Sequence, residues 1–222
     1  IDVVGGSEAV LRNLKVTSTI TASSSAAMAY VGGLAGRINH NALQLEDVAV
    51  TVNGITATST STSTSASLQV GGLFGNGSVP ADSTVSLTVA GAISGTGRAG
   101  SVYAGGAMGN GSVYSPITVI FENSAAVTAE NTGGAADSGG LIGYFASGSV
   151  DLRGSKLVNN TSNAVNITSD ASSLAYAGGW VGQTAVATSA PDDWLYVDGT
   201  TVVTGDFNVT ATSKSSTANA GG

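Results

Sequence analysis

A five-residue glycine pattern recurs along the chain and constrains the fold more than any other feature. Each copy starts with two glycines and ends with a third, and the copies occupy residues 32–36, 71–75, 105–109, 139–143 and 178–182. Their first glycines are 39, 34, 34 and 39 residues apart. A fixed period of this length is typical of tandem repeats, in which each repeat packs against its neighbours. The sequence therefore predicts a single solenoid segment over residues 1–222.

A second series of residues keeps register with the glycines: an aliphatic residue followed by Thr or Ser. Its aliphatic members are Ile20, Ile55, Ile93, Val127, Ile167 and Val209. They precede the next pair of glycines by 12, 16, 12, 12, 11 and 12 residues, and the long interval contains a Thr-Ser run at residues 58–65. We predict that this run is a lengthened loop. We also predict that the six aliphatic residues stack as an inward ladder, which a two-sheet sandwich would not maintain.

Short alternating segments lie between the two series. Residues 48–52 and 85–89 alternate apolar and polar side chains, which is the pattern of a strand with one buried face. Asn-Gly pairs such as those at Asn76 and Asn110 indicate turns, and the paired glycines are expected to supply a positive φ at a sharp corner. No segment has a sustained helical period. The predicted class is all-β, a β-solenoid (β-helix) with about three short strands in each 34–40-residue repeat.

The composition excludes several classes of function. Charged residues make up 9% of the chain, against about 25% in an average soluble domain, so the surface must consist of Ser, Thr, Asn and Gly. A net charge of -7 without a basic stripe argues against nucleic-acid binding. The chain has no cysteine, which removes disulfides and thiol chemistry. No apolar run approaches the roughly 20 residues of a membrane-spanning helix.

Catalytic and metal-binding patterns are not evident. The acidic pairs Glu46-Asp47 and Asp192-Asp193 lie in different repeats, and adjacent residues of a strand point to opposite faces, so neither pair forms an acid-base site. The single histidine, His40, accompanies no nucleophile motif. The Thr-Ser run would resemble an ice-binding array only if neighbouring coils repeated it, and the equivalent stretches do not. We therefore predict no enzyme activity, no catalytic residue, no metal ligand and no cofactor.

Two kinds of residue remain as candidate sites. Asn-x-Ser/Thr sequons make candidate N-glycosylation sites of Asn76, Asn110, Asn159, Asn160, Asn166 and Asn208. A chain so rich in Asn, Ser and Thr also produces sequons by composition alone. Trp194, in an insertion of the fifth repeat, is the candidate contact residue, whereas Trp180 replaces a core Leu and is predicted to fill a layer of the core.

The Gly-Gly-Leu-x-Gly sequences at residues 32–36, 71–75 and 139–143, with Val- and Thr-rich strands between them, resemble the GLUG-type repeats of large extracellular surface proteins. The copies at 105–109 and 178–182 depart from that pattern at the Leu position. The resemblance implies an extracellular or cell-surface location and a passive stalk, adhesin or filament module. It transfers no functional residue.

The leading hypothesis is a non-catalytic structural module of an extracellular fibre, stalk or surface filament. Its partners would be neighbouring repeats or copies of the same protein, with no nucleic acid and no membrane span in this segment. The alternative is an adhesin or binding module that recognises a glycan or a host surface through the insertion loops, and a polysaccharide-cleaving enzyme ranks third. Partial glycine patterns at Gly5-Gly6 and Gly221-Gly222 lead us to expect a longer repeat chain.

Overall fold

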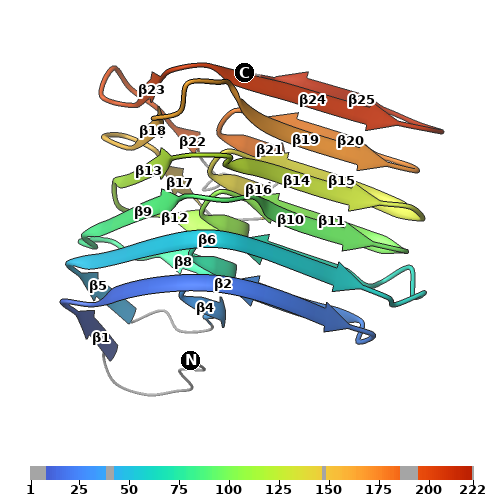
Figure 1. Cartoon of the computed structure of the whole chain (residues 1–222), viewed down its shortest axis with the longest axis horizontal. Coiled ribbons are helices and arrows are strands. Elements are labelled where there is room, and N and C mark those ends of the chain that lie inside the picture. The colour runs from blue at the N-terminus through green and yellow to red at the C-terminus, as the bar shows by residue number, and fades with distance from the viewer. Residues whose placement is uncertain (1–8, 39–42, 147–148, 186–194, 222) are drawn as a thin grey trace.

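The protein, analysed as a computed structural model, is a β-solenoid. The structure describes residues 9–38, 43–146, 149–185 and 195–221, and its regular elements are all strands. Every strand pairing in the described residues is parallel. Figure 1 shows the coils stacked from the N-terminal end at the bottom to the C-terminal end at the top. The predicted fold class is confirmed.

The largest sheet, called here the long sheet, carries the aliphatic ladder. Its aliphatic half consists of β2 (Lys15–Ser24), β6 (Val48–Ser59), β10 (Ile93–Gly97), β14 (Ala126–Asn131), β19 (Val165–Ala171) and β24 (Phe207–Ser213). The other half consists of β9 (Val85–Val89), β13 (Ile117–Phe121), β18 (Lys156–Asn159) and β23 (Val202–Thr204). Strand β6 is long enough to pair with both β9 and β10, so it joins the two halves.

Two further sheets complete each coil. The return sheet contains β3 (Met28–Gly32), β7 (Ser67–Gly71), β11 (Gly100–Gly105), β15 (Gly134–Gly139), β20 (Ala175–Gly178) and β25 (Ala218–Gly221). The short sheet contains β4 (Ala35–Arg37), β8 (Phe74–Val79), β12 (Met108–Val113), β16 (Ile142–Phe145) and β21 (Val181–Thr184). Two small pairs are β1 (Ala9–Arg12) with β5 (Leu43–Glu46), and β17 (Val150–Asp151) with β22 (Leu195–Tyr196).

The predicted inward ladder is present. The six aliphatic residues are direct partners from coil to coil, from Ile20 on Ile55 through to Ile167 on Val209. The four inner members have no exposed surface, whereas Ile20 and Val209 are half-buried because each belongs to an end coil. Five steps separate Ile20 from Val209, which at the usual strand spacing gives a rise of about 24 Å.

The glycine pattern forms the corner between the return sheet and the short sheet, but not for the predicted reason. None of its glycines has a positive φ. Glycine is required instead because the backbones of adjacent coils approach too closely for a side chain. A Cβ added to Gly72 would lie 2.2 Å from the carbonyl oxygen of Gly106, and one on Gly106 would lie 2.0 Å from that of Gly140. The leucines at this corner, Leu73 and Leu141, point into the core as expected and are fully buried.

The structure shortens one predicted loop and contradicts one predicted kind of turn. The Thr-Ser run is a loop between β6 and β7 only from residue 60 onward, because Thr58 and Ser59 belong to β6. The interpretation of the Asn-Gly pairs at Asn76 and Asn110 as turns is wrong. Both pairs lie within strands, β8 and β12, whose residues 76–79 and 110–113 pair in register. Parallel pairing with the neighbouring coil therefore overrides the local turn preference of Asn-Gly.

The glycine corner makes a testable prediction about stability. Gly106→Ala should lower the free energy of unfolding by about 3 kcal/mol, the upper range for overpacked interiors, because the new methyl group meets backbone that cannot rotate away. Gly199→Ala is the control, since nothing lies within 4 Å of its added Cβ, and it should change stability by less than about 0.5 kcal/mol. Urea titrations of both variants measure the difference, and equal midpoints would contradict the packing explanation.

Candidate functional site

A seam of polar and aromatic side chains runs along the solenoid where the return sheet faces the short sheet. The return sheet contributes one column to this polar seam: Tyr30, Gln69, Tyr103, Asp137, Tyr176 and Asn219. The short sheet contributes a second column: Arg37, Asn76, Asn110, Tyr144 and Gln183. Strict register between coils therefore gathers four of the tyrosines into one strip.

Direct contacts join the two columns of the polar seam. The guanidinium carbon of Arg37 lies 5.2 Å from the ring centroid of Tyr30, a cation–π distance. The Asn76 Nδ2 donates a 2.8 Å hydrogen bond to Gln69 Oε1. In the middle of the stack the rings of Tyr103 and Tyr144 lie parallel, with centroids 4.5 Å apart and planes 11° from each other. These contacts fill the space that the glycine corner would otherwise leave between the sheets.

Asp137 is the exceptional member of the polar seam. It is 1% exposed, and neither of its carboxyl oxygens has a hydrogen-bond partner in the described structure. Its neighbours in the column are Tyr103 and Tyr176. Burial raises the pKa of the Asp137 carboxyl to about 8, since a charged carboxylate would lose its hydration without compensation. The folded protein therefore holds this group as the neutral acid at neutral pH.

The polar seam also perturbs two phenols. Burial raises the pKa of Tyr103 and of Tyr144, and the nearby Asp137 carboxyl raises both further. A buried acid beside phenols of raised pKa supplies proton donors but no nucleophile. We assign the polar seam a packing role on this geometry.

Of the two acidic pairs named from the sequence, the structure describes Glu46-Asp47. Glu46 lies in β5 and forms an ion pair with Arg12 of the preceding coil, with Arg12 Nε 2.5 Å from Glu46 Oε2. Asp47 lies in the turn before β6, with φ of 53°. His40, Asp192, Asp193 and the candidate contact residue Trp194 lie outside the described residues. Within the described ranges, no three His, Cys, Asp or Glu side chains are grouped closely enough to hold a metal ion.

The six sequons fall into two groups. Asn76, Asn110 and Asn159 are partly buried, and the Asn159 Nδ2 donates hydrogen bonds to the carbonyls of Asn163 and Asp206. A glycan on that nitrogen would remove one of these bonds. The exposed sequons are Asn160, Asn166 and Asn208, although the Asn208 Nδ2 donates to Asn166 Oδ1 at 3.2 Å, so these two compete for space. Glycosylation stays a prediction at all six positions.

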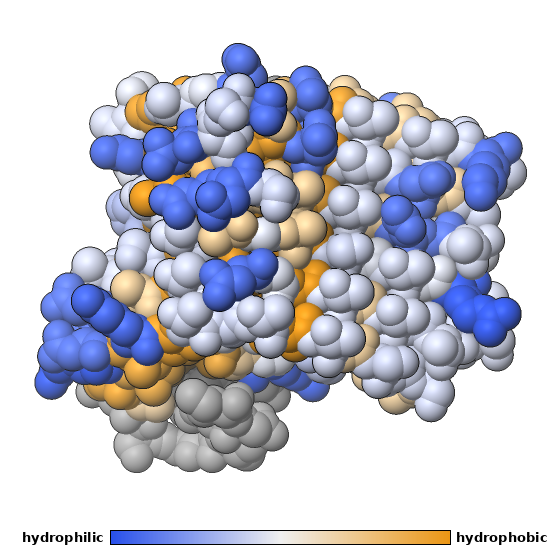
Figure 2. Space-filling view, in the orientation of Figure 1, coloured by the Kyte–Doolittle hydropathy of each residue, from blue (hydrophilic) through white to orange (hydrophobic). Residues whose placement is uncertain are grey.

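The outer face of the long sheet carries a column of hydroxyl side chains, which are the Thr and Ser residues that directly follow the aliphatic series in the sequence. Its members, directly paired from coil to coil, are Thr21, Thr56, Ser94, Thr128, Thr168 and Thr210. Figure 2 shows the pale polar columns of this face running along the stack. The adjacent outward column is Ser23, Thr58, Thr96, Glu130, Asp170 and Thr212, so two neighbouring carboxyl groups interrupt it. The continuous hydroxyl array is therefore one residue wide.

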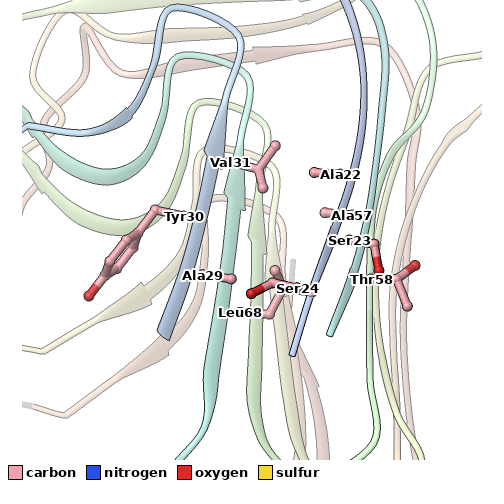
Figure 3. A pocket seen from close by; sticks show the side chains of 9 residues that line it. All are labelled: Ala22, Ser23, Ser24, Ala29, Tyr30, Val31, Ala57, Thr58 and Leu68. Carbon is pink, nitrogen blue, oxygen red and sulfur yellow. The ribbon is translucent and has the colours of Figure 1, made fainter. Parts of the chain in front are cut away.

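Three hollows of the described structure lie towards the two ends of the solenoid. The N-terminal hollow, of about 230 Å³, opens between β2 and β3 and is lined by residues that include Ala22, Ala29, Val31 and Leu68. Figure 3 shows these small side chains facing one another across the gap. At the other end, Trp180 lines two hollows of about 310 and 390 Å³, together with Phe207 and Val209 in the first and Leu195 in the second. Trp180 is half-buried and packs against the edge of the hydrophobic core, as predicted for a residue that fills a layer of the core.

Comparison with known proteins adds no relative: a scan of family models, a search of curated proteins and a search of solved structures each find no match. The resemblance to GLUG-type repeats therefore remains a proposal. The described residues also include no helix long and apolar enough to cross a membrane.

The sequence analysis did not single out Asp137 or the polar seam. A signal was present, because every member of the return-sheet column lies two residues before the first glycine of a pair, as Tyr103 precedes Gly105 and Asp137 precedes Gly139. Aligning the repeats on their glycines gives the column. That Asp137 is buried without a partner could be learned only from the packing of the short sheet against it.

Asp137 makes the stability of the protein depend on pH. The folded-state pKa lies above the value of about 3.9 expected in the unfolded chain, so unfolding releases a proton between pH 4 and pH 8. The contribution of Asp137 to the free energy of unfolding should be greatest below pH 4 and fall by up to about 1.4 kcal/mol per pH unit between pH 4 and pH 8. Asp137→Asn should remove this fall, since Gln69, buried in the same column, shows that an amide suits such a position.

Urea titrations at pH 4, 6 and 8 test this prediction. Asp82→Asn, at an exposed turn position, is the control for the loss of one carboxyl group. A wild-type protein and an Asp137→Asn variant with the same dependence on pH would show that the Asp137 carboxyl is solvated or paired.

Proposed function

We propose that this chain is a non-catalytic structural module of an extracellular fibre, stalk or surface filament. The observation that carries the proposal is that, in the part of the chain that the structure describes, each coil repeats the same columns and pairs its strands with those of the adjacent coils. The length of such a stack grows in proportion to the number of coils, while its cross-section stays constant. That geometry suits a spacer or rod.

The surface and the core support the same proposal. The described residues contain two ion pairs, Arg12–Glu46 and Arg153–Asp151, and the outer face of the long sheet is dominated by Thr and Ser. The fold is held together by stacked aliphatic columns and parallel backbone hydrogen bonds. An extracellular location rests on the resemblance to GLUG-type repeats and on this uncharged, hydroxyl-rich surface.

A binding module remains the second candidate, and one observation favours it. The exposed residues Leu195, Tyr196 and Val197 belong to the predicted insertion around residues 189–198, and Leu195 borders the 390 Å³ hollow with Trp180. If this region recognised a glycan or a host surface, deleting residues 189–194 should abolish adhesion without unfolding the chain. Unchanged adhesion would exclude that loop as the determinant.

Removal of one coil tests the structural role. Deleting residues 93–126 takes out 34 residues, one full period, and brings Val127 to the position of Ile93 in register with Ile55. A rod module should remain folded, lose about 4.8 Å of length and keep its place in the fibre. Circular dichroism, small-angle scattering and labelling of fibres on the producing cells measure these three properties.

Deleting residues 93–109, half a period, is the matched control and should unfold the chain because it brings unlike columns together. The proposal fails if the full-coil deletion folds but loses a specific activity, because that activity would then depend on a site within the deleted coil. Compact particles of the intact protein inside the cell would also contradict it.

A further inference from the structure

In two coils the polar seam is closed by a direct contact between its two columns. Tyr30 and Arg37 are seven residues apart in the first coil, and the guanidinium lies over the ring. Gln69 and Asn76 have the same spacing in the second coil, and a hydrogen bond joins their side chains. Each contact gives a polar or charged group of the seam a partner from its own coil.

The coil that contains β15 and β16 departs from this arrangement. Its two seam members, again seven residues apart, are Asp137 and Tyr144. The Tyr144 ring stacks on Tyr103 of the preceding coil, and neither carboxyl oxygen of Asp137 has a hydrogen-bond partner in the described structure. Asp137 is nevertheless almost completely buried. The seam is therefore closed over this carboxyl group by ring packing rather than by a polar contact.

This coil lies inside the stack, with described strands on both sides of it. Strand β15 pairs on one side with β11 and on the other with β20, and β16 pairs with β12 and β21 (Figure 1). Parallel pairing therefore holds the backbone around Asp137 from two directions. The side chains of the seam are the parts of this coil that can move without breaking it.

No cation faces the Asp137 carboxyl group from the strands packed against β15. These strands are β11, β14, β16, β19, β20 and β21, and none of them contains Lys, Arg or His. Their titratable groups on the seam are the phenols of Tyr103, Tyr144 and Tyr176. Glu130 and Asp170 belong to the outward column of the long sheet. A carboxylate at position 137 would meet neutral phenols and no positive charge, so it requires hydration.

The Tyr144 ring is the group whose movement admits water at the lowest cost. Tyr144 is only partly buried. Rotation about its Cα–Cβ bond takes the ring off Tyr103 and leaves the pairing of β16 with β12 and β21 in place. Displacing β15 instead would break its hydrogen bonds to both neighbouring strands. Side-chain rotation is therefore the path by which the Asp137 carboxylate would become hydrated.

We propose that Asp137, Tyr103 and Tyr144 form a pH-sensitive switch inside the folded solenoid: when Asp137 loses its proton, the Tyr144 ring leaves Tyr103 and water reaches the carboxylate. Strand pairing is retained, so protonation reverses the change. Burial holds the pKa of Asp137 at about 8 in the closed form, and a hydrated aspartate has a pKa of about 3.9, so the observed midpoint lies between these values. The switch goes beyond the proposed function and operates among folded molecules.

An NMR titration of the 222-residue chain, with carbon-13 labels in the Asp carboxyl groups and the Tyr rings, tests the switch. The Asp137 carboxyl carbon should titrate at least about two pH units above the ordinary aspartate value of about 3.9. The ring signals of Tyr103 and Tyr144, which shield each other while stacked, should move to the positions of unstacked tyrosine with the same midpoint. Amide protons of β15 and β16 should stay protected from exchange, because their pairing is retained.

Two variants separate the switch from a general effect of pH. Asp137→Asn should keep the rings stacked throughout the titration, because an amide does not ionise. Tyr144→Ala removes the ring that covers the carboxyl group, so Asp137 should then titrate close to the ordinary aspartate value of about 3.9. Glu130→Gln, which removes an exposed carboxyl group from the neighbouring strand β14, is the matched control and should leave the transition of the carboxyl group and of the rings unchanged.

Any of three results overturns the inference. A wild-type Asp137 that titrates at the ordinary aspartate value would show that its carboxyl group is already hydrated or paired. Ring signals that do not follow the carboxyl group, or that still move in Asp137→Asn, would show that the two are not coupled. Loss of amide protection throughout the solenoid at the same midpoint would show unfolding instead of local opening. If Asp137→Asn fails to fold, Tyr144→Ala decides the question, because an unchanged Asp137 midpoint in that variant also overturns the inference.

Discussion

The close approach of backbone to backbone at the glycine corner is the constraint on which the rest of the structure depends. Adjacent coils are separated by one strand spacing, and at the corner the carbonyl of one coil occupies the space where a Cβ of the next would lie. Backbone hydrogen bonds set the distance between coils, and only glycine tolerates that distance at the corner. The aliphatic ladder and the polar seam then follow, since strict register stacks every residue on its equivalent.

Because of this register, side chains that stabilise the fold and side chains that destabilise it are both stacked in columns. Aliphatic residues stacked in the core form a continuous buried column, and outward Thr residues form a continuous hydroxyl column. The same rule places Asp137 where its equivalents are Tyr103 and Tyr176, and it is buried there without a hydrogen-bond partner. A group held neutral in this way makes the stability of the fold depend on pH.

The outermost described coils differ from the uniform interior of the stack. Ile20 and Val209 are half-buried, whereas the four inner members of their column have no exposed surface. A solenoid completes its core only between coils, so the burial of each member of a column depends on a neighbour on both sides.

Much of this architecture was determined by the sequence alone. The spacing of the glycines and of the aliphatic-Thr series predicted the number of coils, the inward ladder and the position of the long loop. It could do so because stacked coils keep nearly the same number of residues between equivalent positions, and extra residues must form loops. Tertiary structure alone decided why the glycines are needed and which residues meet across the corner. Local preference suggested a positive φ and an Asn-Gly turn, but coil-to-coil contact placed ordinary φ values at the glycines and strands at Asn76 and Asn110. The burial of Asp137 also depends on side chains brought together from two sheets, and no single stretch of the chain carries that information.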